Sequence, residues 1–189
     1  MGWGFPYRFA CLAFFLLVLA GSLCAQQAVD LDGRTVDPFA RDSSKVIVLV
    51  FLRRDCPVSG RYAPSIQQIS QRYAESARFW LVYPDKTETA ADIRKSVDEF
   101  GYHIPVLRDP QHALVKLSRV QITPEVAVFD RNRHLIYDGR IDDWFIDLGR
   151  ARQAPTTHEL EQAIRAAAAG QSVARNEVRG VGCYISDLE

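Results

Sequence analysis

The apolar residues of this chain follow two alternating periods, one typical of strands and one typical of helices. Residues 46–52 form a β-branched, nearly continuous apolar run, the pattern of a central strand buried on both faces. Residues 79–83 form a second run of this kind. Between them, apolar residues recur near helical spacing over residues 66–77, and Pro64 is expected to kink that helix or to mark its start. The pattern predicts a strand–helix–strand unit.

The remaining pattern extends this unit into an α/β domain. The further expected elements are a hairpin over 29–36, a helix capped by Thr89 and Asp92 and ended by Gly101, a strand over 104–107, a helix opened by Asp109-Pro110, a strand over 125–130, a strand over 134–137, and a helix from the Thr156/Glu159 capping box to Gly170. Right-handed crossovers would make the first two main strands parallel. We therefore expect an α/β fold with a central sheet and helices on both faces.

Residues 139–152 show no clear period and are expected to form a surface loop. The loop contains two adjacent acids, Asp142 and Asp143. Paired carboxylates can transfer a proton to a leaving thiolate. Adjacent acids in a polar loop are usually solvated, and that is the expectation for this pair.

The N-terminus has the pattern of a secretory signal. Arg8 is the only charged side chain before residue 30, and an apolar stretch over residues 9–23 follows it. Leu23-Cys24-Ala25 resembles the small-residue end of such a signal. We expect a signal peptide over residues 1–25 and a single exported domain over residues 26–189, periplasmic or extracellular.

Two alternatives to cleavage at the N-terminus are disfavoured. An uncleaved anchor is disfavoured because the apolar stretch is shorter than the roughly 20 residues of a membrane span. Lipid attachment at Cys24 is disfavoured because bulky Leu23 stands where that signal requires a small residue. No stable membrane span is therefore expected in the mature chain.

The composition is that of a soluble globular protein, with 23 basic and 23 acidic side chains and a formal net charge of zero. No stretch gathers Lys and Arg into a patch, which argues against nucleic acid as a partner. The haem-attachment motif Cys-x-x-Cys-His is absent, and no cofactor is expected.

Two cysteines, Cys56 and Cys183, remain after the expected cleavage. An oxidising compartment would permit a disulfide between them. Cys56 falls between the buried run and the first helix, where unpaired N–H groups and the helix dipole favour a thiolate and lower the thiol pKa. Cys56 is therefore the residue expected to carry the chemistry.

Several short motifs resemble one known family. They are Asp55-Cys56-Pro57-Val58-Ser59 with Arg61-Tyr62-Ala63-Pro64, Thr123-Pro124-Glu125, Gly139-Arg140-Ile141-Asp142-Asp143, and Gly182-Cys183-Tyr184-Ile185. The chain resembles secreted redoxins of the alkyl hydroperoxide reductase/thiol-specific antioxidant family. The resemblance implies a thioredoxin-like three-layer fold with a central mixed sheet. It also implies that Pro124 is cis and faces Cys56, and that Thr123 offers its backbone to a docked partner.

The departures from that family limit what the resemblance implies. Thioredoxins carry Cys-x-x-Cys, whereas this chain has Ser59 in place of the second cysteine. Peroxiredoxins place Pro and a Thr or Ser before the peroxidatic cysteine, where this chain has Leu49 and Arg53. Peroxidase activity therefore does not carry over directly.

The resulting hypothesis is a thiol-dependent oxidoreductase acting on a protein disulfide or a small hydroperoxide. Cys56 attacks and Cys183 resolves the adduct, since exchange needs a thiolate and a second thiol. The candidate site residues are Cys56, Cys183, Ser59 and Arg54 for catalysis, with Arg53 as a second cation near the thiol, and Thr123, Pro124, Pro57 and Arg140 for partner binding.

Three alternatives remain open at this point. Cys56 and Cys183 could form a permanent structural disulfide. Cys56, Cys183 and His158 could bind Cu(I), as in copper-delivery proteins for oxidase assembly that share the thioredoxin-like fold. The chain could also be a non-catalytic binding module that keeps the groove between Cys56 and Pro124.

Overall fold

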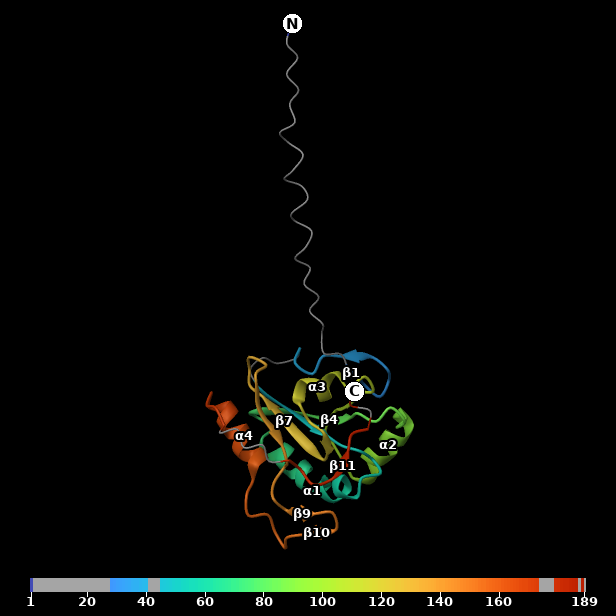
Figure 1. The fold of residues 1–189 in the computed structure, drawn as a ribbon, viewed down its shortest axis with the longest axis vertical. Helices are drawn as coiled ribbons and strands as arrows, with labels where there is room; N and C mark the ends of the chain where they lie inside the picture. The colour runs from blue at the N-terminus through green and yellow to red at the C-terminus, as the bar shows by residue number, and fades with distance from the viewer. Residues whose placement is uncertain (2–27, 41–44, 174–178, 187, 189) are drawn as a thin grey trace.

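The computed structural model of the chain describes residues 1, 28–40, 45–173, 179–186 and 188. Its elements in chain order are β1 (Ala28–Val29), β2 (Thr35–Val36), β3 (Val46–Phe51), α1 (Pro57–Arg72), β4 (Ala77–Tyr83), α2 (Ala90–Glu99), β5 (Val106–Arg108), α3 (Ala113–Ser118), β6 (Ile122–Thr123), β7 (Glu125–Phe129), β8 (Leu135–Gly139), β9 (Phe145–Asp147), β10 (Arg150–Ala151), α4 (Glu159–Ala168) and β11 (Cys183–Tyr184). Figure 1 shows these helices packed around the strands.

The main sheet has seven strands in the order β2-β1-β5-β4-β3-β7-β8. β3 is parallel to β4, and β4 is parallel to β5, as right-handed crossovers predict. β7 pairs antiparallel with β3, and β8 pairs antiparallel with β7. The sheet is therefore mixed, and the expected hairpin of β1 and β2 extends it at one edge.

Helices cover both faces of the sheet, which explains why β3 is apolar at every position. Val46, Val48 and Val50 pack in the core that also holds side chains of α1, α2 and α4. Ile47, Leu49 and Phe51 point the other way, into the core that holds side chains of α3. A strand with alternate residues in two cores has no solvent face, and the expectation of a doubly covered sheet is confirmed.

The helix starts differ from expectation at α3 and α4, whereas α1 follows Cys56 directly, as expected. α1 begins at Pro57 and continues through Pro64. α3 begins at Ala113, later than Asp109-Pro110 predicts, because the Asp109 carboxylate accepts from the amides of Ala113 and Val115 at 2.9 Å each. The Asp109 side chain thus accepts from the first turn of the helix, but the N-cap residue is His112 and the first helical residue is Ala113, so the predicted helix start is wrong.

The expected capping box of α4 is wrong. The helix begins at Glu159, and its N-cap residue His158 makes no side-chain cap hydrogen bond. The Thr156 hydroxyl donates instead to the carboxylate of Asp143. A long-range acceptor therefore takes the hydroxyl that the sequence pattern assigned to the helix end.

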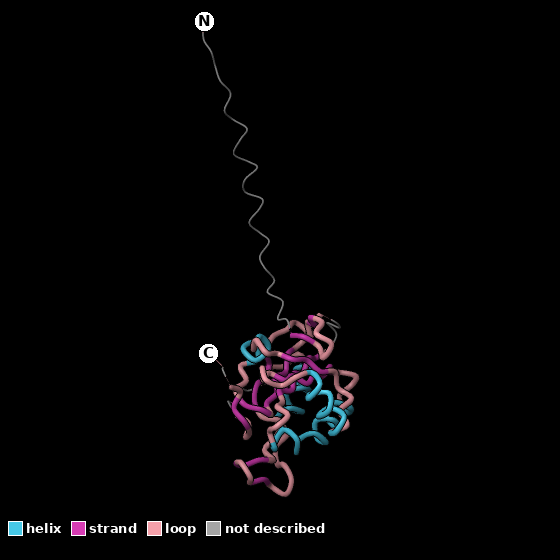
Figure 2. Tube along the Cα trace, turned by 90° about the vertical axis from the view of Figure 1, so that its right-hand side faces the viewer, coloured by secondary structure: helices cyan, strands magenta, loops and turns pink. Residues whose placement is uncertain are grey.

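Residues 139–152 are not the plain surface loop predicted from their lack of period. They contain the antiparallel pair β9 and β10, which projects from one end of the molecule (Figure 2). Ile141 and Phe145 are buried in the core beside α1. The segment is thus anchored at its base, although its tip lies in solvent.

The expected signal peptide, with Cys11 and Cys24, lies outside the described residues apart from Met1. Across the part of the chain that the structure describes, no helix combines the length and the apolar character needed to span a bilayer.

Candidate active site

Cys56 lies where β3 leads into α1, as the sequence predicts. It is the N-cap residue of α1, with Pro57 as the first helical residue, and its carbonyl accepts from the amide of Gly60 at 3.2 Å. The side chain is 1% exposed, and its Sγ lies 3.2 Å from the carbonyl oxygen of Thr123. The helix N-terminus and one backbone carbonyl therefore define the immediate surroundings of the thiol.

Thr123 and Pro124 form the opposite side of the site. The peptide bond between them is cis, as the family resemblance implied. Thr123 is fully buried, and while its carbonyl faces Cys56, its hydroxyl donates to the carbonyl of Cys183 at 3.2 Å. Thr123 thus contacts both cysteines.

Cys183 is brought to the same place by the C-terminal strand. β11 pairs antiparallel with β6, so that Cys183 lies opposite Thr123 and Tyr184 opposite Ile122. Both thiols are free, Cys56 buried and Cys183 partly exposed, and they hydrogen-bond to each other. The predicted nucleophile and resolving thiol, 127 positions apart in the sequence (183 − 56), are therefore in contact.

The environment shifts the two thiol pKa values in opposite directions. Burial raises the pKa of Cys56, but hydrogen bonds from Cys183, from the Ser59 amide and from the Ser59 hydroxyl outweigh it and leave that pKa lowered. Burial, the hydrogen bond to Cys56 and the negative charge of Cys56 raise the pKa of Cys183 to about 11. Cys56 is therefore the thiol that ionises first.

Ser59 is buried where thioredoxins carry their second cysteine. Its hydroxyl is a partner of the Cys56 thiol and lies 3.5 Å from the amide of Arg53. The hydroxyl can stabilise a thiolate but cannot form a disulfide with it. The second sulfur at this site comes from Cys183 instead.

The two arginines before Cys56 have different surroundings. The Arg53 guanidinium binds Asp55 at 2.8 Å and Asp85 at 3.1 Å. Arg54 is exposed, and its amide donates to a carboxylate oxygen of Glu88 at 2.7 Å. The groups that lower the pKa of Cys56 are Cys183, Ser59 and the Val58 amide, so the thiolate is stabilised mainly by dipoles.

Pro57 is exposed on the first turn of α1, beside the thiol, where a partner can reach it. Arg140 is bound elsewhere. Its guanidinium contacts the Glu159 carboxylate, with Nε to Oε1 at 2.9 Å, and the Thr157 hydroxyl at 3.3 Å. These contacts tie the end of β8 to the start of α4 and do not place Arg140 at Cys56.

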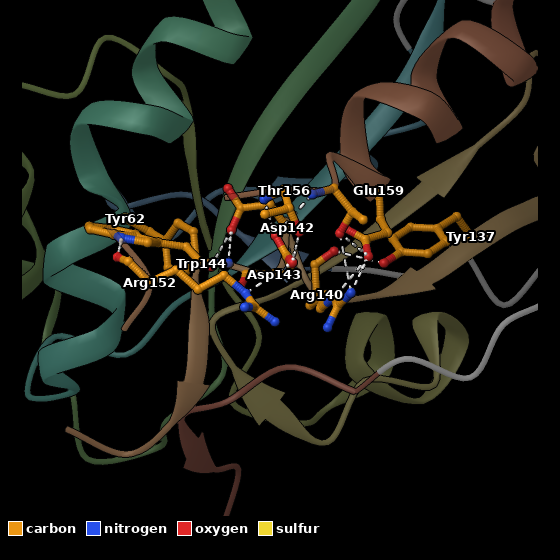
Figure 3. A network of polar contacts seen from close by, with 10 residues as sticks. Tyr62, Tyr137, Arg140, Asp142, Asp143, Trp144, Arg152, Thr156 and Glu159 are labelled. Atoms are coloured by element: carbon orange, nitrogen blue, oxygen red, sulfur yellow. Dashed lines mark hydrogen bonds and ion pairs between the residues drawn. The ribbon is translucent and has the colours of Figure 1, made fainter. Parts of the chain in front are cut away.

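Asp142 and Asp143 are buried, so the expectation of a solvated pair is wrong. They are 7% and 4% exposed and belong to a polar network between α1, α4 and the β8–β9 connection (Figure 3). Asp142 accepts from the Tyr62 hydroxyl at 2.6 Å and from the Trp144 amide at 2.9 Å. Burial raises the pKa of Asp142.

Asp143 has more donors than Asp142. It accepts from the amides of Thr156 and Thr157 at 2.6 and 2.9 Å, and it pairs with Arg152 at 3.1 Å. Burial acts to raise its pKa, but these donors and the Thr156 hydroxyl hold the pKa far below its ordinary value. The network fixes the loop and supplies no contact to either thiol.

Two glutamates near the thiols were missed by sequence reasoning. Glu125 is fully buried and accepts from the amides of Gln121 at 3.0 Å and Gly180 at 2.9 Å, which joins β6 to the C-terminal segment. Its place in the Thr123-Pro124-Glu125 motif was the available signal. Glu88 lies in a polar stretch that reads as an ordinary loop, and nothing in the pattern indicated its burial.

The proposed copper set is not assembled. His158 lies at the N-cap position of α4, whereas Cys56 and Cys183 meet at α1 and β6. Within the described ranges, no three His, Cys, Asp or Glu side chains gather closely enough to hold a metal ion.

Comparisons with solved structures show the fold. A hypothetical protein from Sinorhizobium meliloti 1021 matches with a TM-score of 0.70 and 22% identity, over 84% of this chain and 88% of that chain. An uncharacterised protein from Geobacillus kaustophilus matches with a TM-score of 0.70 and 22% identity, over 84% and 86%. A secreted Mycobacterium tuberculosis disulfide oxidoreductase matches with a TM-score of 0.53 and 17% identity, over 74% and 94%.

A search of the curated proteins found no match. Residues 43–135, which run from β3 to the start of β8, match a family model described as thioredoxin-like. This stretch includes Cys56, Ser59 and the Thr123-Pro124 bond. The sheet with helices on both faces, the match over these residues and the similarity to the solved structures together show that this chain has a thioredoxin-like fold.

Proposed function

We propose that this protein is a thiol–disulfide oxidoreductase in which Cys56 is the nucleophile and Cys183 the resolving thiol. The observation that supports it most is the contact between two free thiols, one of them at a helix N-terminus. The lowered pKa of Cys56 favours the reactive thiolate. The raised pKa of Cys183 keeps it protonated until Cys56 has reacted.

The reaction consists of two balanced exchanges. The Cys56 thiolate attacks one sulfur of a partner disulfide, that S–S bond breaks, and the other sulfur leaves as a thiolate that takes up a proton. Cys183 then loses its proton and attacks Cys56 Sγ, which breaks the mixed disulfide and forms the Cys56–Cys183 bond. The partner gains two electrons and this protein loses two, and a reducing partner dithiol reverses the cycle.

The neighbouring residues have distinct proposed roles. Ser59 donates to the thiolate, and Thr123 with Pro124 forms the wall against which a partner segment lies. Pro57 and Arg54 are exposed on the rim of the site and are proposed to contact the partner. Arg140 has no part in this scheme because its guanidinium is bound to Glu159.

A disulfide is favoured over a hydroperoxide as the substrate. Arg53 stands where peroxiredoxins carry the hydroxyl that orients a peroxide, and its guanidinium binds Asp55 and Asp85. Among the described residues of the first turn of α1, only Ser59 carries a hydroxyl.

The proposal includes export. The pattern over residues 1–25 resembles a signal peptide, and one of the proteins that share the fold is a secreted disulfide oxidoreductase. An exported chain works in a compartment that permits protein disulfides, the proposed substrates.

The test is mass spectrometry of the purified protein after exposure to oxidised glutathione. The unchanged chain should pass rapidly to a Cys56–Cys183 disulfide, whereas Cys183→Ser should stop at a glutathione adduct on Cys56. Tyr184→Ala is the matched control, since the neighbouring Tyr184 is 73% exposed, and it should behave as the unchanged chain does.

An inert Cys56 would contradict the proposal, as would a Cys56–Cys183 disulfide that resists dithiothreitol in the folded protein. The latter result would support a structural disulfide. A parallel exposure to hydrogen peroxide should oxidise Cys56 more slowly than the disulfide does, and the reverse order would make the protein a peroxidase.

A further inference from the structure

The C-terminal segment, residues 179–186, is attached along β6 as a short antiparallel strand. Cys183 lies opposite Thr123, and the amide of Ile185 donates to the carbonyl of Gln121 at 2.9 Å. β6 and β11 form a two-stranded sheet separate from the main sheet. The segment therefore occupies an edge that would otherwise offer free backbone groups.

This segment also closes access to Cys56. The Cys56 side chain is 1% exposed, with Thr123 on one side and Cys183 in contact with its thiol. An incoming sulfur must reach Cys56 Sγ directly to form a mixed disulfide. The C-terminal segment must therefore move, and its movement frees the backbone groups of β6.

Close approach of the two backbones selects small residues in the segment. A Cβ added at Gly182 would overlap the carbonyl oxygen of Thr123. A Cβ added at Gly180 would lie 2.8 Å from the carbonyl oxygen of Pro124. The position directly before the cysteine accordingly accepts only glycine without a shift of the strand.

Past the cysteine, the segment has one exposed and one buried side chain. Tyr184 is 73% exposed, whereas Ile185 is 7% exposed and packs in the core beside α3. Arg179, at the start of the segment, forms an ion pair with Glu125, with its guanidinium nitrogen 3.7 Å from a carboxylate oxygen. A segment bound to β6 in this way therefore needs an extended backbone with glycine, cysteine, any residue and an apolar residue in that order.

We propose that residues 179–186 are an intramolecular ligand of the β6 edge, and that the partner segment which displaces them has the pattern Gly-Cys-x-apolar in an extended backbone. This inference rests on the proposed function, because the partner's cysteine is the one that Cys56 attacks. Strand addition at a sheet edge supplies backbone hydrogen bonds, and pockets for particular side chains supply the specificity.

The test uses a fluorescent peptide of residues 179–186 carrying Cys183→Ser, so that binding is measured without exchange. Its affinity is determined by anisotropy with the full chain and with two full-chain variants, Gly182→Val and Ile185→Asp, each of which prevents docking of the chain's own segment. A tethered segment competes at an effective concentration of order millimolar. Both variants should therefore bind the peptide at least about tenfold more tightly than the unchanged chain.

Ser186→Ala is the matched control, since Ser186 is an exposed residue of the same segment, and it should leave the affinity unchanged. On the Gly182→Val protein, a peptide with valine before the serine, or with aspartate in place of the isoleucine, should bind at least tenfold more weakly. A peptide with alanine in place of the tyrosine should bind as the parent does.

Equal affinity for the unchanged chain and both variants would overturn the inference, and so would indifference to the peptide substitutions. The glutathione experiment separates this failure from failure of the proposed function. Exchange at Cys56 without selective peptide binding would remove only the docking site. Selective binding without exchange would leave the docking site and remove the oxidoreductase.

Discussion

The thiol site at the start of α1 and the carboxylate network around Asp143 both bury polar groups, but these groups have different kinds of partner. Asp143 accepts from two amides, a hydroxyl and a guanidinium. The Cys56 thiol has a carbonyl, a hydroxyl and a second thiol around it. Sulfur is a weak donor and acceptor, so the contacts of the thiol are easier to exchange. The first arrangement fixes a loop, and the second leaves room for a reaction.

The largest effect expected from this comparison is on activity. Cys56→Ser should reduce disulfide exchange at least about 1000-fold, because burial raises the pKa of the remaining thiol, Cys183, and keeps it protonated. The free energy of unfolding should change little, since serine is nearly the same size. The rate with oxidised glutathione and a urea unfolding curve measure the two quantities. Residual exchange above that level would show that Cys183 can start the reaction.

The next largest effect should be on stability without an effect on chemistry. Asp143→Ala should lower the free energy of unfolding by about 4 kcal/mol, because it removes the charged acceptor of two partly buried amide hydrogen bonds and the ion pair to Arg152. Asp147→Ala, an exposed acid on β9, is the control and should cost less than about 0.5 kcal/mol. Urea unfolding measures both. Equal costs would mean that the network is not what holds the loop.

Another buried acid, Glu88, whose carboxylate accepts from the Arg54 amide close to Cys56, makes the stability depend on pH. Burial raises its pKa to about 7, aided by the charges of Asp85 and Asp55 and opposed by the hydrogen bond from the Arg54 amide. Below about pH 4.5 Glu88 is protonated in both the folded and the unfolded chain. Between about pH 4.5 and 7 the folded chain holds a proton that the unfolded chain releases, so stability falls as the pH rises.

Glu88→Gln should remove this fall, which corresponds to about 3 kcal/mol for a shift of this size. The amide side chain can still accept from the Arg54 amide, so the loop before Cys56 should keep its place. Melting temperatures between pH 4.5 and 8 provide the measurement, with the exposed Glu99→Gln as control. A slope that persists in Glu88→Gln would assign the titration to another group.

The sequence could predict the features that neighbouring residues determine, but not those that depend on residues far apart in the chain. β3, β4 and the helix after Cys56 follow from local periodicity, and the capping of α2 by Thr89 was predicted from neighbouring residues and is confirmed by its bond from the Asp92 amide at 3.1 Å. The burial of Asp142 was not predictable in this way, because its partner Tyr62 lies 80 positions away. Two adjacent acids in a polar stretch are predicted to be solvated, because the groups that donate hydrogen bonds to them come from distant parts of the chain.

The residues of the candidate site also differ in whether neighbouring or distant residues determine their contacts. Cys56 and Ser59 belong to one short motif, and both the thiol and its hydroxyl partner could be assigned from it. The contact of Cys183 with Thr123 joins positions 60 apart, and it depends on the close backbone approach at Gly182. A glycine before a cysteine has many explanations in a sequence, so the docking of the segment on β6 emerged only from the structure.

The smallest expected effect concerns the hydroxyl that holds the thiolate. Ser59→Ala removes one of the hydrogen bonds that lower the pKa of Cys56, so the pH midpoint of its alkylation by iodoacetamide should move up toward the ordinary thiol value of about 8.5. The Ser59 amide, the Val58 amide and Cys183 still act on the thiol, which keeps the change modest. Ser70→Ala, later on α1, removes only a bond to the Gln67 carbonyl and is the control. A midpoint that does not move in Ser59→Ala would mean that the helix amides and Cys183 alone stabilise the thiolate, and that the serine in place of a second cysteine serves packing.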